Sequence, residues 1–365
     1  MILPTSFCCE MDTLRPRTQR AQSFAKDLFL PLLRDSFASL AVIKLFCNRN
    51  SLDALERRPF VTAPTSLRRP TSLAELRERT KGMGTEEGRN FGRSFPLQPT
   101  DVVISPYGKS GTTWLQQIVH GLRTRGDMAF DDISRVVPWL ETSYDLGIDL
   151  HAPQRGHPRA FKSHLNWAEI PKGGRYIVSF RDPKDVLVSG YRFMEGWFFE
   201  PGSIDIETWA KDSFANREKG GYWRHLRSWW EQRHNPQVLL LCYEAMTKDL
   251  PWTVRTVARF IGVPLDAELF DIVVRQSSLE FMLAHKDRFD DRLMREHSER
   301  IAGLPPGSDS AKVRKGEIGS HWYELPPTIS DEMDQIWREE IESTLGFPTY
   351  QALREAWQQE VKPSA

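Results

Sequence analysis

The sequence predicts an α/β fold in three layers: a parallel sheet, helices on both of its faces, and a P-loop-like phosphate-binding loop. From Asp101 onward, short apolar runs rich in β-branched residues alternate with amphipathic stretches. Continuous apolar strands separated by helices indicate a parallel sheet that is covered on both faces. A loop rich in glycine and hydroxyl side chains directly follows the first of these runs. This is the position at which α/β proteins bind phosphate groups.

The expected strands are short, apolar and bounded by turn residues. They comprise residues 102–104, 176–180 and 238–241, and a shorter run over residues 159–161 precedes a Lys-Ser-His segment. Helix starts are marked by an acidic N-cap residue close to a proline, as at Asp182 before Pro183 and at Asp249 before Leu250 and Pro251. Gly262 is expected to end the second of these helices.

Residues 1–95 show no alternation of strands and helices. We expect them to form an N-terminal extension, partly helical or loosely ordered, ahead of a single domain over residues 96–365. The apolar stretch over residues 28–47 is interrupted by Arg34, Asp35 and Lys44, which a helix inside a bilayer would carry at high cost. No transmembrane span is therefore expected, and Arg15, Arg17 and Arg20 leave a transit peptide open.

The composition limits the classes of partner. The chain has 365 residues with 49 basic and 49 acidic side chains, so its net charge favours neither nucleic acid nor an anionic membrane. The four cysteines, Cys8, Cys9, Cys47 and Cys242, show neither a disulfide framework nor the spacing of a zinc site. We expect a reducing, cytoplasmic location and no metal site.

The loop over residues 105–114 has the composition of an anion cradle. It contains two glycines that permit close backbone approach, one lysine and several hydroxyl donors: Gly108, Lys109, Ser110, Gly111, Thr112 and Thr113. The helix that follows directs its N–H groups and its dipole toward a phosphate or sulfate. The loop is not a Walker A motif, because that pattern needs glycine where Val103 stands. The alternative interpretation is an ordinary turn capped by serine and threonine.

This loop resembles the first signature of the cytosolic sulfotransferase family, Tyr-Pro-Lys-Ser-Gly-Thr-Thr-Trp, with Gly108 in place of the proline. Residues 181–189, Arg-Asp-Pro-Lys-Asp-Val-Leu-Val-Ser, resemble the second signature, and residues 314–322 resemble the third. The resemblance extends from about residue 95 to about residue 350. It implies that residues 96–365 form a sulfotransferase domain.

The resemblance also implies a donor, 3′-phosphoadenylyl sulfate (PAPS), and its product, adenosine 3′,5′-bisphosphate. Arginine at a strand end and a flexible Arg-Lys-Gly segment suit a further phosphate group. Ser277 and Leu279 stand where the family has threonine and phenylalanine in its nucleotide site. The residues implied to bind the donor are Lys109, Ser110, Gly111, Thr112, Thr113, Trp114, Arg181, Ser189, Tyr243, Ser277, Leu279, Arg314, Lys315 and Gly316.

Three residues are implied to be catalytic. The segment Lys162-Ser163-His164 resembles the Lys-Thr-His segment of the family, in which the histidine is the general base. A histidine suits this role because its ordinary pKa of about 6.5 lets it accept a proton near neutral pH. Lys109 and Lys162 are expected to stabilise charge on the leaving oxygen and on the transferring sulfuryl group.

The acceptor is expected to be a small molecule with a hydroxyl or an amine, apolar or ring-bearing. By the resemblance, aromatic residues flank its pocket, with core packing as their alternative role: Trp139, Tyr144, Trp167, Phe193, Trp197, Phe198 and Phe199. The dimer segment of the family is matched only in part, by residues 326–329 and Glu332, which leaves a dimer open.

Two other functions compete with this interpretation. The first is a P-loop kinase-like phosphotransferase that uses ATP and magnesium, which the missing Walker glycine disfavours. The second is a non-catalytic nucleotide-binding protein on the same fold. The presence of both Lys109 and His164 argues against that second possibility.

Overall fold

A computed structural model of the chain describes residues 67–214, 221–310, 312–314 and 316–362. The expectations for residues 28–47, for Cys8, Cys9 and Cys47, and for Lys315 lie outside these described residues. The chain divides into two units, Met1–Val61 and Thr62–Ala365, and the described residues all belong to the second.

The centre of this unit is a four-stranded parallel sheet with the strand order β2-β1-β3-β4. The strands are β1 (Val102–Ile104), β2 (Ala160–Lys162), β3 (Arg175–Phe180) and β4 (Val238–Cys242). The three apolar runs expected from the sequence are thus confirmed as strands, and the short run before the Lys-Ser-His segment supplies the edge strand β2. Nearly every strand residue is buried, as expected for a parallel sheet with both faces covered.

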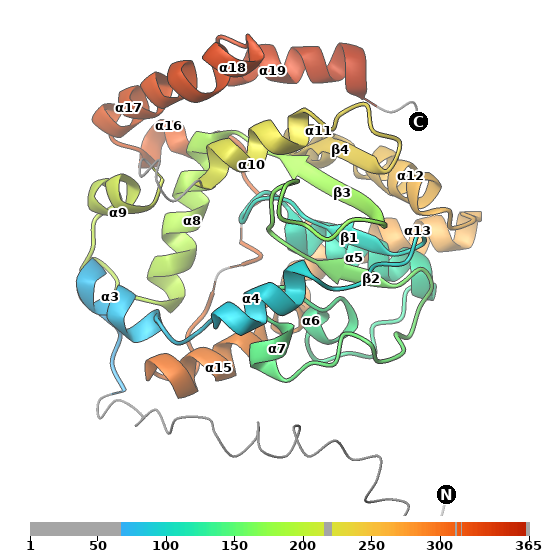
Figure 1. Cartoon of the computed structure of the whole chain (residues 1–365), viewed down its shortest axis with the longest axis horizontal. Coiled ribbons are helices and arrows are strands. Elements are labelled where there is room, and N and C mark those ends of the chain that lie inside the picture. The colour runs from blue at the N-terminus through green and yellow to red at the C-terminus, as the bar shows by residue number, and fades with distance from the viewer. Residues whose placement is uncertain (1–66, 215–220, 311, 315, 363–365) are drawn as a thin grey trace, which may run out of the picture. The chain divides into compact units, whose positions relative to one another are not determined.

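Helices surround the sheet (Figure 1). Those of the N-terminal and central parts are α3 (Leu73–Thr80), α4 (Glu86–Arg93), α5 (Thr112–Thr124), α6 (Ile133–Val136), α7 (Ser143–Leu146), α8 (Pro183–Trp197), α9 (Ile206–Ser213), α10 (Gly221–Trp230), α11 (Tyr243–Lys248), α12 (Leu250–Ile261) and α13 (Ala267–Gln276). The C-terminal part contains α14 (Leu279–Ala284), the 3₁₀ turn Lys286–Arg288, α15 (Arg292–Ala302), α16 (His321–Glu324), α17 (Pro327–Trp337), α18 (Ser343–Leu345) and α19 (Tyr350–Ala356), with π-helical turns over Arg338–Glu342 and Trp357–Val361.

The helix boundaries follow the local signals in the sequence. Asp182 caps α8 by accepting a hydrogen bond from the backbone N–H of Lys184, and a proline occupies the first turn. Asp249 caps α12 in the same way, and Gly262 ends it in the left-handed conformation with φ of 76°. Because capping satisfies N–H groups that have no partner within the helix, these boundaries could be predicted without tertiary information.

The two faces of the sheet are covered by different helices (Figure 1). On one face, Trp229 of α10 packs against Tyr176 of β3, and Trp230 packs against Phe180. Helix α5 contacts β1 and β2 and is in turn contacted by α12 and α13. This three-layer arrangement confirms the predicted fold class.

Residues 67–95, which the sequence assigned to the extension, form α3 and α4 and pack on the rest of the unit. Leu76 of α3 and Phe95 are buried. The guanidinium of Arg79 donates hydrogen bonds of 2.8 and 2.6 Å to the carbonyl oxygens of Ala302 and Gly303, at the end of α15. Within the described residues, no helix is long and apolar enough to cross a membrane.

Candidate active site

The predicted site residues meet at the carboxyl-terminal edge of the sheet. Lys109 lies in the loop after β1, and His164 directly follows β2, which pairs with β1. Arg181 follows β3, and Tyr243 follows β4. In a parallel sheet these strand ends share one edge, which is where ligands of α/β proteins bind. Residues more than 130 positions apart in the chain are therefore neighbours here.

The loop after β1 leaves the N-terminus of α5 without a side-chain cap. Gly111 is the N-cap residue, with φ of 95°, and no side chain caps the first turn. The hydroxyl oxygens of Ser110 and Thr112 are buried and have no hydrogen-bond partner in the described part of the chain. Buried hydroxyls without partners are costly, so a turn capped by serine and threonine does not account for this loop. A polar ligand would supply the missing partners.

Two further residues hold this loop in place. The guanidinium of Arg181 donates a hydrogen bond of 3.0 Å to the carbonyl oxygen of Lys109 and lies 4.4 Å from the centre of the Tyr243 ring. A side chain at Gly111 would place its Cβ 3.1 Å from that ring. Glycine is therefore favoured at position 111 for two reasons: it tolerates the positive φ, and it leaves room for the Tyr243 ring.

Trp114, Ser277, Leu279 and Gly316 form a second group of predicted site residues, beside the first turn of α5. The indole N–H of Trp114 donates to the carbonyl oxygen of Ser277 at 2.8 Å, and the Ser277 hydroxyl is fully buried without a partner in the described chain. The Leu279 side chain is 43% exposed and would lie 3.2 Å from a Cβ at Gly316. An apolar exposed side chain beside an unpartnered hydroxyl suits one face of a nucleotide.

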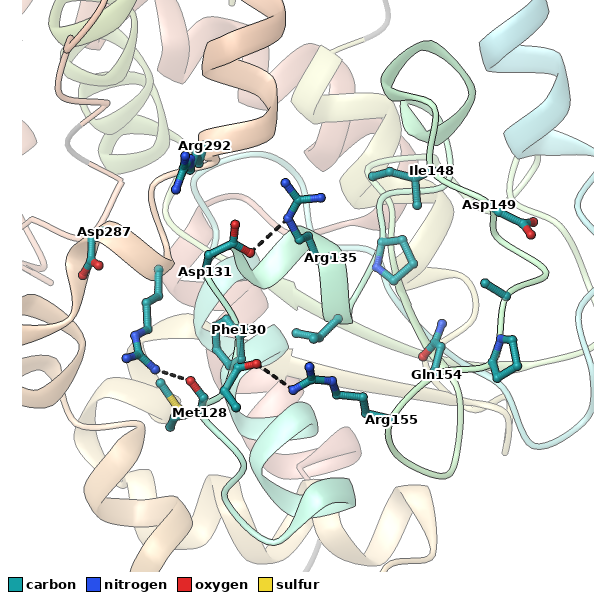
Figure 2. A pocket seen from close by; sticks show the side chains of 16 residues that line it. Met128, Phe130, Asp131, Arg135, Ile148, Asp149, Gln154, Arg155, Asp287 and Arg292 are labelled. Atoms are coloured by element: carbon teal, nitrogen blue, oxygen red, sulfur yellow. Dashed lines mark hydrogen bonds and ion pairs between the residues drawn. The ribbon is translucent and has the colours of Figure 1, made fainter. Parts of the chain in front are cut away.

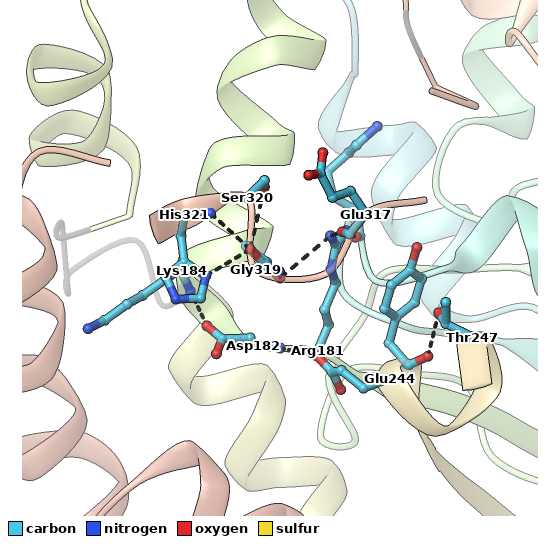
Figure 3. A network of polar contacts seen from close by, with 12 residues as sticks. Arg181, Asp182, Lys184, Glu244, Thr247, Glu317, Gly319, Ser320 and His321 are labelled. Atoms are coloured by element: carbon cyan, nitrogen blue, oxygen red, sulfur yellow. Dashed lines mark hydrogen bonds and ion pairs between the residues drawn. The ribbon is translucent and has the colours of Figure 1, made fainter. Parts of the chain in front are cut away.

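Asp185 joins the second motif to the third. Figure 3 shows Arg181 of the second motif beside Glu317, Gly319 and His321 of the third. The carboxylate of Asp185 accepts hydrogen bonds from the backbone N–H groups of Gly319 and His321, at 2.7 and 3.2 Å, and from Nδ1 of His321 at 2.8 Å. Burial alone would raise the pKa of Asp185, but these hydrogen bonds lower it below its ordinary value. The guanidinium of Arg181 also donates to the carbonyl oxygen of Glu317 at 2.9 Å. The glycine-rich third motif is thus anchored beside the loop after β1.

The other residues predicted to bind the nucleotide make fewer contacts with the rest of the site. The Arg314 side chain is 31% exposed and lies 4.0 Å from a carboxylate oxygen of Glu324. Thr113 is half-buried in the first turn of α5, and Ser189 is half-buried on α8, about two helical turns after Arg181.

His164 is held in the tautomer that a general base needs. Its Nδ1 lies 2.7 Å from the carbonyl oxygen of Pro106, so Nδ1 carries the proton and Nε2 is left as the acceptor. Its backbone N–H donates to a carboxylate oxygen of Glu141 at 2.7 Å. Burial, followed by the charge of Lys162, lowers the pKa of His164 to about 3. The imidazole is therefore neutral at neutral pH.

The two lysines predicted to be catalytic lie in buried environments that lower their pKa values. Burial, then repulsion from Lys312 and Arg181, lowers the pKa of Lys109 to about 7. Burial also lowers the pKa of Lys162 to about 8. Nζ of Lys162 lies 3.7 Å from the centre of the Trp139 ring, and Nζ of Lys109 lies 4.6 Å from that of Phe193. Such ammonium groups are poised to pair with an anion.

The aromatic residues assigned to the acceptor pocket divide between the site and the core. Trp139 contacts both Lys162 and His164, the latter with ring centroids 5.0 Å apart, and Phe193 contacts Lys109. Tyr144 instead packs on Phe91. The other four residues pack in the core: Trp167, Trp197, Phe198 and Phe199.

A separate hollow of about 770 Å³ is lined by residues of the segments before and after Trp139 and by the region around α15 (Figure 2). None of the predicted site residues lines it. Its arginines are already engaged: Arg135 pairs with Asp131, and Arg155 donates to the carbonyl oxygen of Ala129. Within the described chain, no group of three or more His, Cys, Asp or Glu side chains could hold a metal ion.

Sequence patterns missed several residues near the site. Asp185 stands inside the second motif, but nothing in that motif indicates that it binds the third. Glu141, Asp291 and Lys312 carry no recognisable pattern. They are brought to His164 and Lys162 by chain segments distant in sequence.

Comparison with known proteins identifies the family of the chain. A family model, Sulfotransferase domain, matches residues 99–345. Sulfotransferase 2A1 of Rattus norvegicus is 30% identical over 279 residues, covering 73% of this chain and 92% of that protein. The Amine sulfotransferase of Oryctolagus cuniculus is 30% identical over 260 residues, covering 68% and 82%. The crystal structure of retinol dehydratase with androsterone and inactive cofactor PAP shares the fold, with a TM-score of 0.56 at 20% identity over 71% of this chain and 85% of that chain.

Proposed function

Since the chain belongs to the sulfotransferase family, we propose that it transfers a sulfuryl group from PAPS to a hydroxyl or an amine of a small acceptor. One observation carries the proposal. Lys109 and His164 lie at the ends of the paired strands β1 and β2, beside a helix N-terminus that no side chain caps.

Binding of the donor is supported by the unpartnered polar groups of the site. The buried hydroxyls of Ser110 and Thr112 and the free N–H groups at the start of α5 suit the 5′-phosphate. The Ser277 hydroxyl and the Arg314 guanidinium suit the 3′-phosphate, together with Arg181. Tyr243 and Trp114 offer aromatic surface near these groups, with ring centroids 6.1 Å apart. The residues present therefore fit this nucleotide.

The donor supplies the sulfuryl group, and the protein supplies positioning and charge. Nε2 of His164 takes the proton from the acceptor hydroxyl or amine, since Nδ1 is fixed by the Pro106 carbonyl. Lys109 stabilises the negative charge that develops on the leaving phosphate oxygen, and Lys162 stabilises the oxygens of the transferring group. Their lowered pKa values mean that both gain charge readily when an anion approaches.

The acceptor is an apolar or ring-bearing molecule in this proposal. Support comes from the rings of Trp139 and Phe193, which lie directly beside the catalytic side chains. The names of relatives include both a 3-beta-hydroxysteroid sulfotransferase and an amine sulfotransferase, so both nucleophiles belong in the test. We place the activity in the cytoplasm, as the few cysteines of the chain suggest.

The test incubates the full chain with ³⁵S-labelled PAPS and a panel of phenols, steroids and amines. We expect labelled product that persists in EDTA, and adenosine 3′,5′-bisphosphate that binds at least about tenfold more tightly than AMP, because charge-assisted contacts contribute about 1.5–3 kcal/mol each. Magnesium-dependent phosphoryl transfer from ATP, with no sulfated product, would replace the proposal by the kinase-like function. Equal affinities for the two nucleotides would remove the 3′-phosphate site.

A further inference from the structure

Asp291 is a buried carboxylate that lies between two lysines from distant parts of the chain. Its Oδ2 lies 3.9 Å from Nζ of Lys162 and forms an ion pair with Nζ of Lys312. Its Oδ1 accepts a hydrogen bond of 3.3 Å from the Ser134 hydroxyl. The Asp291 side chain is 4% exposed. A charge removed from water in this way needs such partners to be tolerated.

Asp291 occupies the N-cap position of α15, but its carboxylate does not cap that helix. An aspartate at this position ordinarily caps the helix by accepting a hydrogen bond. Asp132 performs that task from the start of α6, accepting a hydrogen bond of 2.9 Å from the backbone N–H of Leu293. The backbone of Asp291 is left-handed, with φ of 49°. This conformation is uncommon outside glycine, although aspartate and asparagine tolerate it.

The two lysines that Asp291 contacts belong to the reacting centre. Lys162 is two residues from His164, and its Nζ lies over the Trp139 ring that also contacts His164. The charge of Lys312 contributes to the lowered pKa of both Lys109 and His164. Lys312 is therefore within electrostatic reach of both residues, although neither its position nor that of Asp291 falls inside a sequence motif.

We propose that Asp291 is a positioning residue that holds Lys162 and Lys312 together as a charged pair beside the transferring sulfuryl group. The inference rests on the proposed function. Without the carboxylate, two ammonium groups would lie close together in a buried site, and each would lose either its position or its proton. With it, both are pre-organised to meet the negative charge of the transition state.

The protonation of Lys162 follows from all the charged groups around it. These groups are His164 on its own segment, Glu141 from the loop after Trp139, Asp132 from α6, Asp291 ahead of α15, and Lys312 after it. Burial lowers the pKa of Lys162 to about 8, Asp291 raises it, and Lys312 lowers it. Removing Asp291 or Lys312 must therefore move this pKa in opposite directions.

The first experiment follows this pKa in the whole chain without any donor. Lysine labelled with ¹³C at Cε is titrated by NMR, and the Lys162 signal is assigned by its loss in Lys162→Gln. Asp291→Asn, which keeps the shape and tolerates the left-handed backbone, should lower the midpoint by about one pH unit. Lys312→Gln should raise it. This second variant keeps the test decisive if Asp291→Asn does not fold.

The matched control is Asp290→Asn, which changes the neighbouring carboxylate. Asp290 pairs with Arg295 and accepts from the Ser310 hydroxyl, rather than contacting a lysine. We expect the Lys162 midpoint to stay in place in this control. An unchanged midpoint in Asp291→Asn, or an equal shift in Asp290→Asn, overturns the inference.

The second experiment measures turnover with labelled donor across pH. Asp291→Asn should lower kcat by about tenfold or more and move the alkaline limb of the profile to lower pH, with KM for the donor within about threefold. Normal kcat and an unmoved limb, with only a lower Tm, would mean that Asp291 is structural. If the wild-type chain sulfates no acceptor, the proposed function fails, while the NMR titration still decides the role of Asp291.

Discussion

Two properties of His164 determine its role in the site: its tautomer is fixed, and its pKa is strongly lowered. Its Nδ1 proton is engaged by the Pro106 carbonyl, and burial keeps the ring neutral far below neutral pH. A neutral imidazole with one free nitrogen is positioned to accept a proton, and the negative charge of a bound donor would favour its protonated form. It cannot serve as a permanent cation for the phosphates. The contribution of His164 should therefore appear in turnover and hardly in donor binding.

The variant His164→Ala tests this division. We expect kcat to fall by about 10²- to 10⁴-fold, since the proposed base is removed, while the affinity for adenosine 3′,5′-bisphosphate stays within about threefold. Turnover and calorimetric affinity are measured on the same folded preparation. Near-normal turnover of the variant on its best acceptor would show that the histidine only packs against Trp139 and the loop.

Lys109 should behave differently, because it titrates near neutral pH. Burial and the charges of Lys312 and Arg181 lower its pKa to about 7, and a bound phosphate raises it again by attraction. Above pH 7 the complex therefore holds more protons than the free protein, so binding takes up a proton and affinity falls as pH rises.

This linkage can be measured at pH 8 by calorimetry in buffers with different heats of ionisation. Binding of adenosine 3′,5′-bisphosphate should take up close to one proton in the wild type, and Lys109→Met should reduce the uptake and weaken binding. Equal uptake in both proteins would assign the proton to another group.

The loop between β1 and α5 depends on glycine at one of its two glycine positions. Gly111 has φ of 95° and lies against Tyr243, whereas a Cβ at Gly108 would meet no atom within 4 Å. Gly111→Ala should lower the free energy of unfolding by about 1–3 kcal/mol and weaken bisphosphate binding at least about tenfold, because the N–H groups of α5 would shift.

Gly108→Ala is the matched control for that variant. It should change the stability by no more than about 0.5 kcal/mol and leave bisphosphate binding intact. Denaturant unfolding and calorimetry measure the two quantities. If both substitutions have the same effect, the conformation of Gly111 is not what shapes the anion site.

On the scale of the whole molecule, we propose that the catalytic unit begins before α3 rather than at residue 96. Leu76 and Phe95 are buried, and Arg79 binds the end of α15, the helix that Asp291 precedes. Residues Met1–Val61 belong to a separate unit. The contacts of α3 therefore support the same region that carries Asp291.

Two truncated chains test this boundary. A chain of residues 62–365 should keep its Tm and its affinity for adenosine 3′,5′-bisphosphate. A chain of residues 96–365 loses buried apolar contacts of about 1.5–3 kcal/mol per large side chain, which should lower Tm by about 5 °C or more. Equal Tm values for the two chains, measured by scanning calorimetry, would support a catalytic unit that begins at residue 96.

The sequence by itself determined the fold class, the strands and the position of the loop predicted to bind an anion. These features rest on local signals: apolar runs, the caps Asp182 and Asp249, the stop at Gly262, and glycines beside hydroxyl residues. Local backbone preferences and the placement of apolar side chains act within a few residues, so they can be read along the chain. The same signals placed Lys109 and His164 at neighbouring strand ends.

Only the tertiary structure decided which side chains meet around those strand ends. It brings Asp185 under the third motif, sets the tautomer of His164 through Pro106, and places Asp291 between Lys162 and Lys312. It also separates Trp139 and Phe193 at the site from aromatic residues of the core. Such contacts join segments up to 136 residues apart, and no periodicity along the chain encodes them. They follow from how the helices and loops pack on the sheet, because this packing determines both which side chains are buried and which charges pair.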